Sequence, residues 1–265
     1  MNFFETVVLG IIQGLTEWLP ISSSGHLVIL HNLLGLDVPL IFDVALHVGT
    51  LIAVIVFFLK DLAETFVSLV KLDFKSEKGR LITYVVAGSV PITLIGFMFH
   101  DRIEQAFVNP LIVYMGLIAS GVLIYLTKYA KNRGKLDYRN SIIIGTAQAA
   151  ALIPGISRSG FTISTARILG IQKEVAFKFS FFMAVPAVIG ASIFELSSAN
   201  LNEIGIESIL IGTITSAIVG YMSLRLLYAV LQRGRFHLFA YYCWIVGISA
   251  LLINLFVLLP SFNIF

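Results

Sequence analysis

Long apolar runs separated by short polar segments dominate the hydrophobic pattern of this chain. Six of these runs are long enough for an α-helix to cross the roughly 30 Å hydrocarbon core of a bilayer. They cover residues 40–59, 81–99, 110–127, 175–196, 206–231 and 238–259. The pattern therefore predicts an all-α polytopic membrane protein with six transmembrane helices.

Two further apolar regions are interrupted by polar residues near their middle. Region 3–35 contains Glu17 and Pro20 followed by three successive serines, and region 140–170 contains Pro154 and Arg158. Each half is short for a spanning helix, and non-helical backbone is tolerated at membrane depth only where protein or a watery cavity surrounds it. We expect each region to be a re-entrant helical hairpin.

The two interrupted regions resemble each other when the sequence is shifted by 135 residues without gaps, about half of the 265-residue chain. Polar and glycine identities coincide in this register: Gly10 with Gly145, Gln13 with Gln148, Ser22 with Ser157, Ser24 with Ser159, and Gly25 with Gly160. The matches predict an internal duplication of one membrane domain, 1–265, into repeats 1–130 and 136–265. Each repeat would hold one hairpin and three spans. Because three is odd, the repeats would have inverted topology.

Composition and loop charge support a membrane location. Hydrophobic residues make up 58% of the chain and charged residues 12%, whereas soluble domains carry about 25% charged residues. Fourteen Lys and Arg residues fall in alternate loops on one side, against Arg102 alone on the other. The positive-inside rule makes the first side cytoplasmic and places both termini outside. The net charge of +3 comes from these basic loop residues. Because the charges mark membrane topology, we expect no nucleic-acid partner.

The same topology predicts that the hairpins enter the membrane from opposite faces and that their polar turns meet near its middle, where inverted-repeat proteins place their sites. No cleavable signal peptide is expected, because the first five residues lack a basic region. No soluble domain is expected either, because the longest polar stretch, residues 60–80, is too short to fold alone.

The first hairpin carries the sequence QGLTEWLPISSSGH, residues 13–26. Gln13 and Glu17 are four residues apart and share one helical face. A carboxylate within the membrane is costly, which makes Glu17 a candidate functional residue; the alternative is a structural pair with Arg158. Pro20 ends this helix, and the next begins in a serine run whose free N–H groups and hydroxyls suit an anion. The run supplies Ser22, Ser23 and Ser24.

The second hairpin carries PGISRSGFT, residues 154–162, which adds an arginine to a similar turn. A guanidinium binds two oxygens of a phosphate at once. We therefore expect Arg158, with Ser157, Ser159 and Thr162, to form a phosphate site. The alternative is that Arg158 only neutralises Glu17.

Histidines near these turns are candidates for proton transfer, because imidazole titrates near neutral pH. A lone histidine is usually structural, but His26 follows the serine run and Glu17, so we favour a catalytic role. His47 and Asp43 are weaker candidates, either lining the same cavity or pairing with each other.

A carboxylate, serines, a histidine and an arginine together suit phosphoryl transfer, where catalysis is mainly positioning and charge neutralisation. The lipid surroundings suggest a lipid phosphate as substrate. A divalent cation, Mg²⁺ or Ca²⁺, would find a thin protein shell in Glu17 and Gln13, with phosphate oxygens supplying the other ligands.

These motifs resemble the undecaprenyl-diphosphate phosphatase family, which is linked to bacitracin resistance. The resemblance runs over the whole chain and rests on residues 13–26 and on PGISRSG followed by Thr162. It implies hydrolysis of undecaprenyl diphosphate to the monophosphate, recycling of the lipid carrier for cell-wall synthesis, divalent-cation dependence, and a plasma-membrane site reached from outside. It also implies functional roles for Glu17, Ser23, His26 and Arg158. The first acidic position of the family motif is Gln13 here, which weakens a two-carboxylate metal site.

The resulting hypothesis has the diphosphate held by Arg158 and its serines, with Ser23 or a water attacking the terminal phosphorus and His26 or Glu17 as base. The main alternative is a polyprenyl-phosphate transporter or flippase without hydrolysis. A purely structural scaffold would leave the buried Glu, Arg and His unexplained. The sequence leaves a homodimer open.

Overall fold

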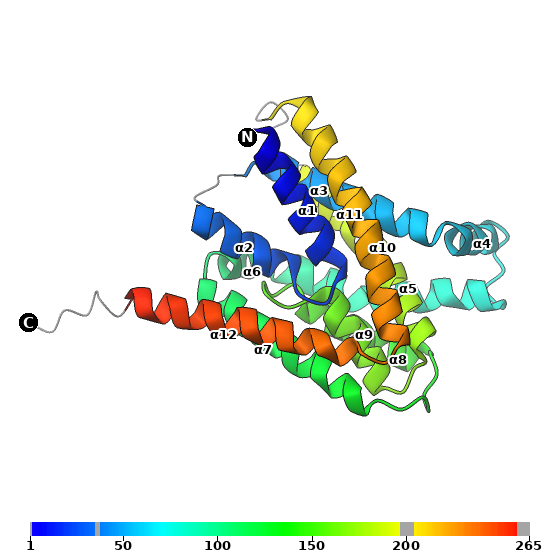
Figure 1. The fold of residues 1–265 in the computed structure, drawn as a ribbon. Coiled ribbons are helices and arrows are strands. Elements are labelled where there is room, and N and C mark those ends of the chain that lie inside the picture. The colour runs from blue at the N-terminus through cyan, green and yellow to red at the C-terminus, as the bar shows by residue number, and fades with distance from the viewer. Residues whose placement is uncertain (1, 35–37, 197–203, 259–265) are drawn as a thin grey trace, which may run out of the picture.

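The computed structural model describes residues 2–34, 38–196 and 204–258, and within them the regular structure is entirely helical (Figure 1). The predicted end of the first hairpin at residue 35, part of the loop near residues 199–207 and the predicted end of the last span at residue 259 lie outside the described residues.

Six helices are long and apolar enough to cross a membrane, which confirms the six predicted spans. Their bounds are α3 Leu40–Phe57, α5 Glu77–Met98, α7 Pro110–Leu126, α10 Lys173–Leu196, α11 Ile206–Gln232 and α12 Phe239–Leu258. Short 3₁₀ helices, η1 Thr127–Tyr129 and η2 Phe236–Leu238, follow α7 and precede α12.

Two pairs of shorter helices occupy the interrupted regions. The first pair is α1 Phe3–Trp18 and α2 Ser23–Leu34, and the second is α8 Tyr138–Ala150 and α9 Arg158–Ile168. The helices of each pair contact each other, so both regions are helical hairpins, as predicted. Their path through a membrane and the inverted duplication stay predictions.

Equivalent serines begin the second helix of each hairpin. The hydroxyl of Ser22 accepts a hydrogen bond from the Gly25 amide at 3.2 Å, and that of Ser157 accepts one from the Gly160 amide at 3.1 Å. Each hydroxyl satisfies one of the unpaired amides of a helix N-terminus. The two caps coincide in the register of the sequence repeat, so the repeated residues perform the same local task.

The first helix of each hairpin packs against a span from the other half of the chain. Helix α1 lies against α11, side by side in Figure 1, and α8 lies against α5. Both contacts need glycine: a Cβ on Gly14 would approach that of Val219 to 2.7 Å, and one on Gly145 would approach the Gly88 carbonyl oxygen to 2.0 Å. This reciprocal packing interlocks the halves and holds the two hairpins in fixed relation.

Two amphipathic helices, α4 Leu59–Val70 and α6 His100–Phe107, lie outside the predicted elements. Residues 60–80, read from the sequence only as a polar stretch, contain most of α4. None of its residues is buried, and Phe66 and Val70 are exposed. Asp61 ties α4 to the spans, because it pairs with Lys78 of α5 at 2.8 Å and with Lys178 of α10.

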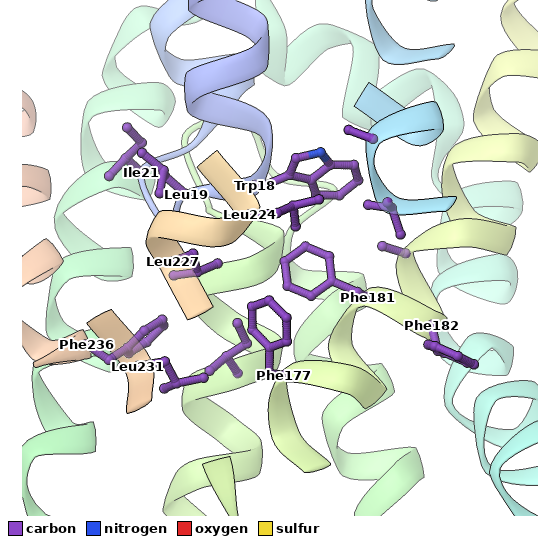
Figure 2. Close-up of a cluster of buried hydrophobic side chains, with 14 of the residues drawn as sticks. Trp18, Leu19, Ile21, Phe177, Phe181, Phe182, Leu224, Leu227, Leu231 and Phe236 are labelled. Atoms are coloured by element: carbon purple, nitrogen blue, oxygen red, sulfur yellow. The ribbon is translucent and has the colours of Figure 1, made fainter. Parts of the chain in front are cut away.

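An aromatic and aliphatic cluster lies behind the turn of the first hairpin (Figure 2). Trp18 meets Phe181 edge to face at 5.3 Å between ring centroids, and its indole N–H donates to the Thr50 carbonyl at 3.1 Å. Arg158 lies 5.6 Å from the centroid of the Trp18 ring. The cluster therefore fixes Glu17, the neighbour of Trp18, opposite Arg158.

Candidate functional site

Glu17 and Arg158 form an ion pair that joins the two hairpins. Oε1 of Glu17 accepts a hydrogen bond from Nη2 of Arg158, and the side chains are 2% and 21% exposed respectively. A second link runs from the Gly155 amide to the Ser24 hydroxyl at 3.4 Å. The prediction that the two polar turns meet is confirmed by these contacts.

The other carboxylate oxygen of Glu17 gathers three more side chains. Oε2 accepts hydrogen bonds from the Ser23 hydroxyl at 2.6 Å and from Nε2 of Gln13 at 3.0 Å. Nε2 of His47 lies 3.7 Å from the same oxygen. The short Ser23 contact is of the length expected for a hydroxyl donating to a carboxylate, so Glu17 is placed to take the Ser23 proton.

Arg158 is a partly exposed cation in this cluster, with 21% of its side chain accessible. It is the first residue of α9, directly after the Ser157 cap, so the guanidinium sits beside a helix N-terminus, where an anion is stabilised. Ser23 is also partly exposed, while Glu17 is buried beneath both. A phosphate at this place meets the guanidinium and the serine hydroxyl first.

The remaining predicted phosphate ligands are already bonded within the hairpins, and all of them except the partly exposed Ser24 are buried. Ser22 and Ser157 act as helix caps, and Ser159 approaches the Ser157 hydroxyl at 3.4 Å. Thr162 donates to the Arg158 carbonyl at 2.8 Å and is fully buried. Ser157, Ser159 and Thr162 thus bond within the first turn of α9, which begins at Arg158, and Ser22 does so in α2. Direct contact of these hydroxyls with substrate stays a prediction.

Ser22 also has a backbone φ of 69°, in the left-handed region that non-glycine residues rarely adopt. Such strain persists only when surrounding contacts impose it, and it gathers at functional sites. Here it reverses the chain between α1 and α2 and brings Ser23 back to Glu17.

The histidine nearest Glu17 is His47, although the sequence favoured His26. The Nδ1–H group of His47 donates to the Asp43 carbonyl at 2.8 Å, which leaves Nε2 facing the carboxylate. His47 therefore lines the site, and it bonds to the backbone of Asp43.

His26 lies instead between the first hairpin and α12. Its Nδ1–H group donates to the Ser22 carbonyl at 2.7 Å, and its Nε2 accepts from the Tyr242 hydroxyl at 2.8 Å. The two rings stack at 5.7 Å between centroids. A catalytic role for His26 stays a prediction. Sequence reasoning missed Tyr242 entirely, because no motif or spacing marks it.

The oxygens around Glu17 determine whether a divalent cation fits this site. Among the described residues no group of three or more His, Cys, Asp or Glu side chains could hold a metal. Oε1 of Gln13, however, is buried without a hydrogen-bond partner. Turning this amide over would bring Oε1 toward Oε2 of Glu17, which is favourable only with a cation between them. Gln13 and Glu17 therefore fit a cation whose other ligands are substrate oxygens.

Comparison with known proteins places this geometry in a family. The model of the family described as "Bacitracin resistance protein BacA" matches residues 6–249. The chain belongs to this family. The BacA match includes the second hairpin, all of the first hairpin from residue 6 onward, and every site residue from Gln13 to Tyr242.

Curated relatives agree with the BacA match over nearly their full length. The chain is 40% identical over 259 residues to the undecaprenyl-diphosphatase of Korarchaeum cryptofilum, covering 95% of this chain and 99% of the relative. It is 40% identical over 261 residues to that of Halothermothrix orenii, covering 96% and 98%. It is 42% identical over 250 residues to that of Caldicellulosiruptor bescii, covering 91% and 94%.

Proposed function

We propose that this chain is a membrane phosphatase that hydrolyses undecaprenyl diphosphate to the monophosphate and inorganic phosphate. The reaction recycles the lipid carrier of cell-wall synthesis and thereby confers bacitracin resistance. The observation that carries the proposal is the cluster of Ser23, Glu17 and Arg158 at the meeting of two hairpins, in a chain whose relatives are named undecaprenyl-diphosphatases.

In the proposed reaction Arg158 binds nonbridging oxygens of the terminal phosphate and Ser23 attacks its phosphorus. A bond forms between the Ser23 oxygen and phosphorus, the bridging P–O bond breaks, and the undecaprenyl monophosphate leaves. The Ser23 proton passes to Glu17, 2.6 Å away. Water then hydrolyses the phosphoserine. The second form of the proposal has a water, held by Ser23 and Glu17, attack directly.

The ion pair couples proton transfer to charge stabilisation. While Glu17 is ionised, it holds the Arg158 guanidinium. Once Glu17 accepts the proton, its attraction for Arg158 falls, and the guanidinium is free to bind the charge that develops on the phosphate oxygens. A divalent cation, Mg²⁺ or Ca²⁺, held by Glu17 and Gln13, would supply further neutralisation of phosphate charge.

We further propose that the protein lies in the plasma membrane with the site opening to the extracytoplasmic side, as the family resemblance implies. The distribution of loop Lys and Arg favours the matching topology, in which both termini lie outside. The chemistry does not need the homodimer that the sequence leaves open, because Glu17 and Arg158 come from one chain.

The test is phosphate release from undecaprenyl diphosphate by the purified protein in lipid vesicles. Wild type is expected to release phosphate, to lose activity with a chelator and to regain it with Mg²⁺ or Ca²⁺, whereas Glu17→Ala is expected to be inactive throughout. A wild-type protein that releases no phosphate, together with a Glu17→Ala variant that still moves the lipid across the vesicle membrane, would favour a transporter and overturn the proposal.

A further inference from the structure

A groove of about 690 Å³ lies between the first hairpin and the last two spans. It is bounded by α1, α2, α11 and α12, and almost all of its lining is aliphatic or aromatic. Its polar lining side chains are Thr16, His26 and Tyr242. Both the volume and the apolar lining are typical of small-molecule sites, which run from about 300 to 1,000 Å³.

Helix α2 connects the Ser23–Glu17–Arg158 cluster to the groove, because Ser23 belongs to the cluster and His26 lines the groove. Ser23 and His26 are three residues apart in that helix and therefore share a face. Ile29 and Leu30 prolong the same face into the groove. A molecule whose phosphate lies at Ser23 therefore finds, within one helical turn, the beginning of an apolar channel.

The groove is open along its length to the surface that the spans present to lipid. Leu15, Leu226 and Leu238 belong to its lining, and each is exposed. A molecule in such a groove contacts apolar protein side chains on one side and the lipid bilayer on the other. A long isoprenoid chain meets this requirement, since its apolar surface is satisfied by either environment.

We propose that this groove binds the part of the prenyl chain nearest the diphosphate, with the His26–Tyr242 pair at its polar end and the rest of the chain in the bilayer. The proposal rests on the proposed phosphatase function and names the surface that selects its substrate. It makes Leu226 of α11 a specificity-determining residue.

The test compares two tryptophan substitutions on the same face of α11. Leu226→Trp fills the groove, and Ile218→Trp, two turns away and similarly exposed at 59% against 51%, does not line it. Leu226→Trp is expected to raise the KM for undecaprenyl diphosphate about tenfold, the size of effect that pocket shape gives in substrate discrimination. Its KM for inorganic diphosphate, which has no prenyl chain, is expected to stay unchanged, and Ile218→Trp is expected to match wild type on both substrates.

A second measurement needs no groove variant. A prenyl diphosphate carrying a benzophenone close to the diphosphate is expected to label peptides containing Leu226 or Phe239 after irradiation of the wild-type protein, in preference to the peptide around Ile218. Labelling spread evenly over exposed residues of α11 and α12, or the same KM for wild type and Leu226→Trp, would overturn the groove proposal. A wild-type protein inactive on both substrates would instead count against the phosphatase function, while the labelling pattern would still report on the groove.

Discussion

The Tyr242 hydroxyl donates a hydrogen bond to Nε2 of His26 at 2.8 Å and ties the first hairpin to the last span. Because Nδ1 of the same ring donates to the Ser22 carbonyl, both ring nitrogens are engaged and the ring orientation is fixed. His26 therefore contacts the turn that carries Ser23, while the Ser23 hydroxyl itself donates to Glu17, the base of the proposed reaction.

Removing the Tyr242 hydroxyl tests this tie. Tyr242→Phe keeps the ring stack and loses one hydrogen bond of about 1 kcal/mol, so we expect the melting temperature to fall roughly 2–4 °C and kcat/KM to fall about fivefold. Thermal unfolding in detergent and phosphate release measure the two effects. The control is Tyr241→Phe, because the Tyr241 hydroxyl makes no hydrogen bond within the described part of the chain. Equal behaviour of the two variants would contradict the tie.

Substitutions that remove the charges of Glu17 and Arg158 distinguish a structural role of this ion pair from a catalytic one. Glu17→Gln leaves the Arg158 guanidinium without its partner, which costs about 3 kcal/mol for a buried pair. The double variant Glu17→Gln with Arg158→Gln removes both charges and is expected to regain more than half of that loss in thermal unfolding. Activity is expected to stay down at least about 100-fold in both variants, because the base is absent. If the double variant regains activity, the Glu17–Arg158 pair has a structural role and no catalytic one.

The identity of the nucleophile is decided at Ser23. If its hydroxyl attacks phosphorus, Ser23→Ala lowers kcat by at least about 100-fold, and acid quenching of wild type with terminally labelled substrate traps a phosphoserine. Ser24→Ala is the matched control, because the Ser24 hydroxyl makes only long contacts of 3.2 and 3.4 Å, and we expect it to keep activity within about threefold. Nearly full activity of Ser23→Ala would assign the attack to water.

The charge cluster on α4 predicts a pH dependence of stability. Burial tends to raise the pKa of Asp61, but hydrogen bonds and charge from Lys178 and Lys78 outweigh it and lower this pKa. A lowered carboxyl pKa contributes stability above the unfolded-state value near 4, and this stability is lost as the pH falls through the folded-state value. The pKa of Glu64 is also lowered, because its carboxylate lies 2.9 Å from Nζ of Lys78 and accepts a hydrogen bond from it.

We therefore expect this contribution to be constant between pH 7 and 5 and to fall below about pH 4. Asp61→Asn should lower the melting temperature at pH 7 by roughly 2 °C, because the ion pairs that it removes are partly exposed and screened by solvent. It should also flatten the decline in stability at acid pH. The control is Asp101→Asn. Asp101 is exposed on α6 and forms no ion pair among the residues that the structure describes. An acid decline in Asp61→Asn as steep as in wild type would contradict the assignment.

The spans were predictable because hydropathy summed over about twenty residues is a property of composition. Helix α4 was missed because Lys60, Asp61 and Glu64 lower that sum, although apolar residues at helical spacing, Leu62, Phe66 and Val70, mark an amphipathic helix. A period of 3.6 residues is the signal that would have found it.

Within the site, the meeting of Glu17 and Arg158 was predictable from the repeat and the loop charges, because these define which turns face each other. The choice between His26 and His47 was not, because an imidazole turns toward whichever partner the tertiary structure supplies. For His26 that partner is Tyr242, 216 residues away in the sequence. No local sequence pattern predicts a contact at that separation.

The 141 residues between Glu17 and Arg158 also impose an order on the making of the protein. The ribosome releases the carboxylate in the first hairpin long before its arginine exists, and a carboxylate without a counter-charge costs several kcal/mol at membrane depth. Helix α1 moreover rests on α11, which is synthesised later still. The packing partners of the first hairpin therefore become complete only after the second half of the chain has been made, and a chain interrupted before residue 158 lacks the Glu17–Arg158 pair.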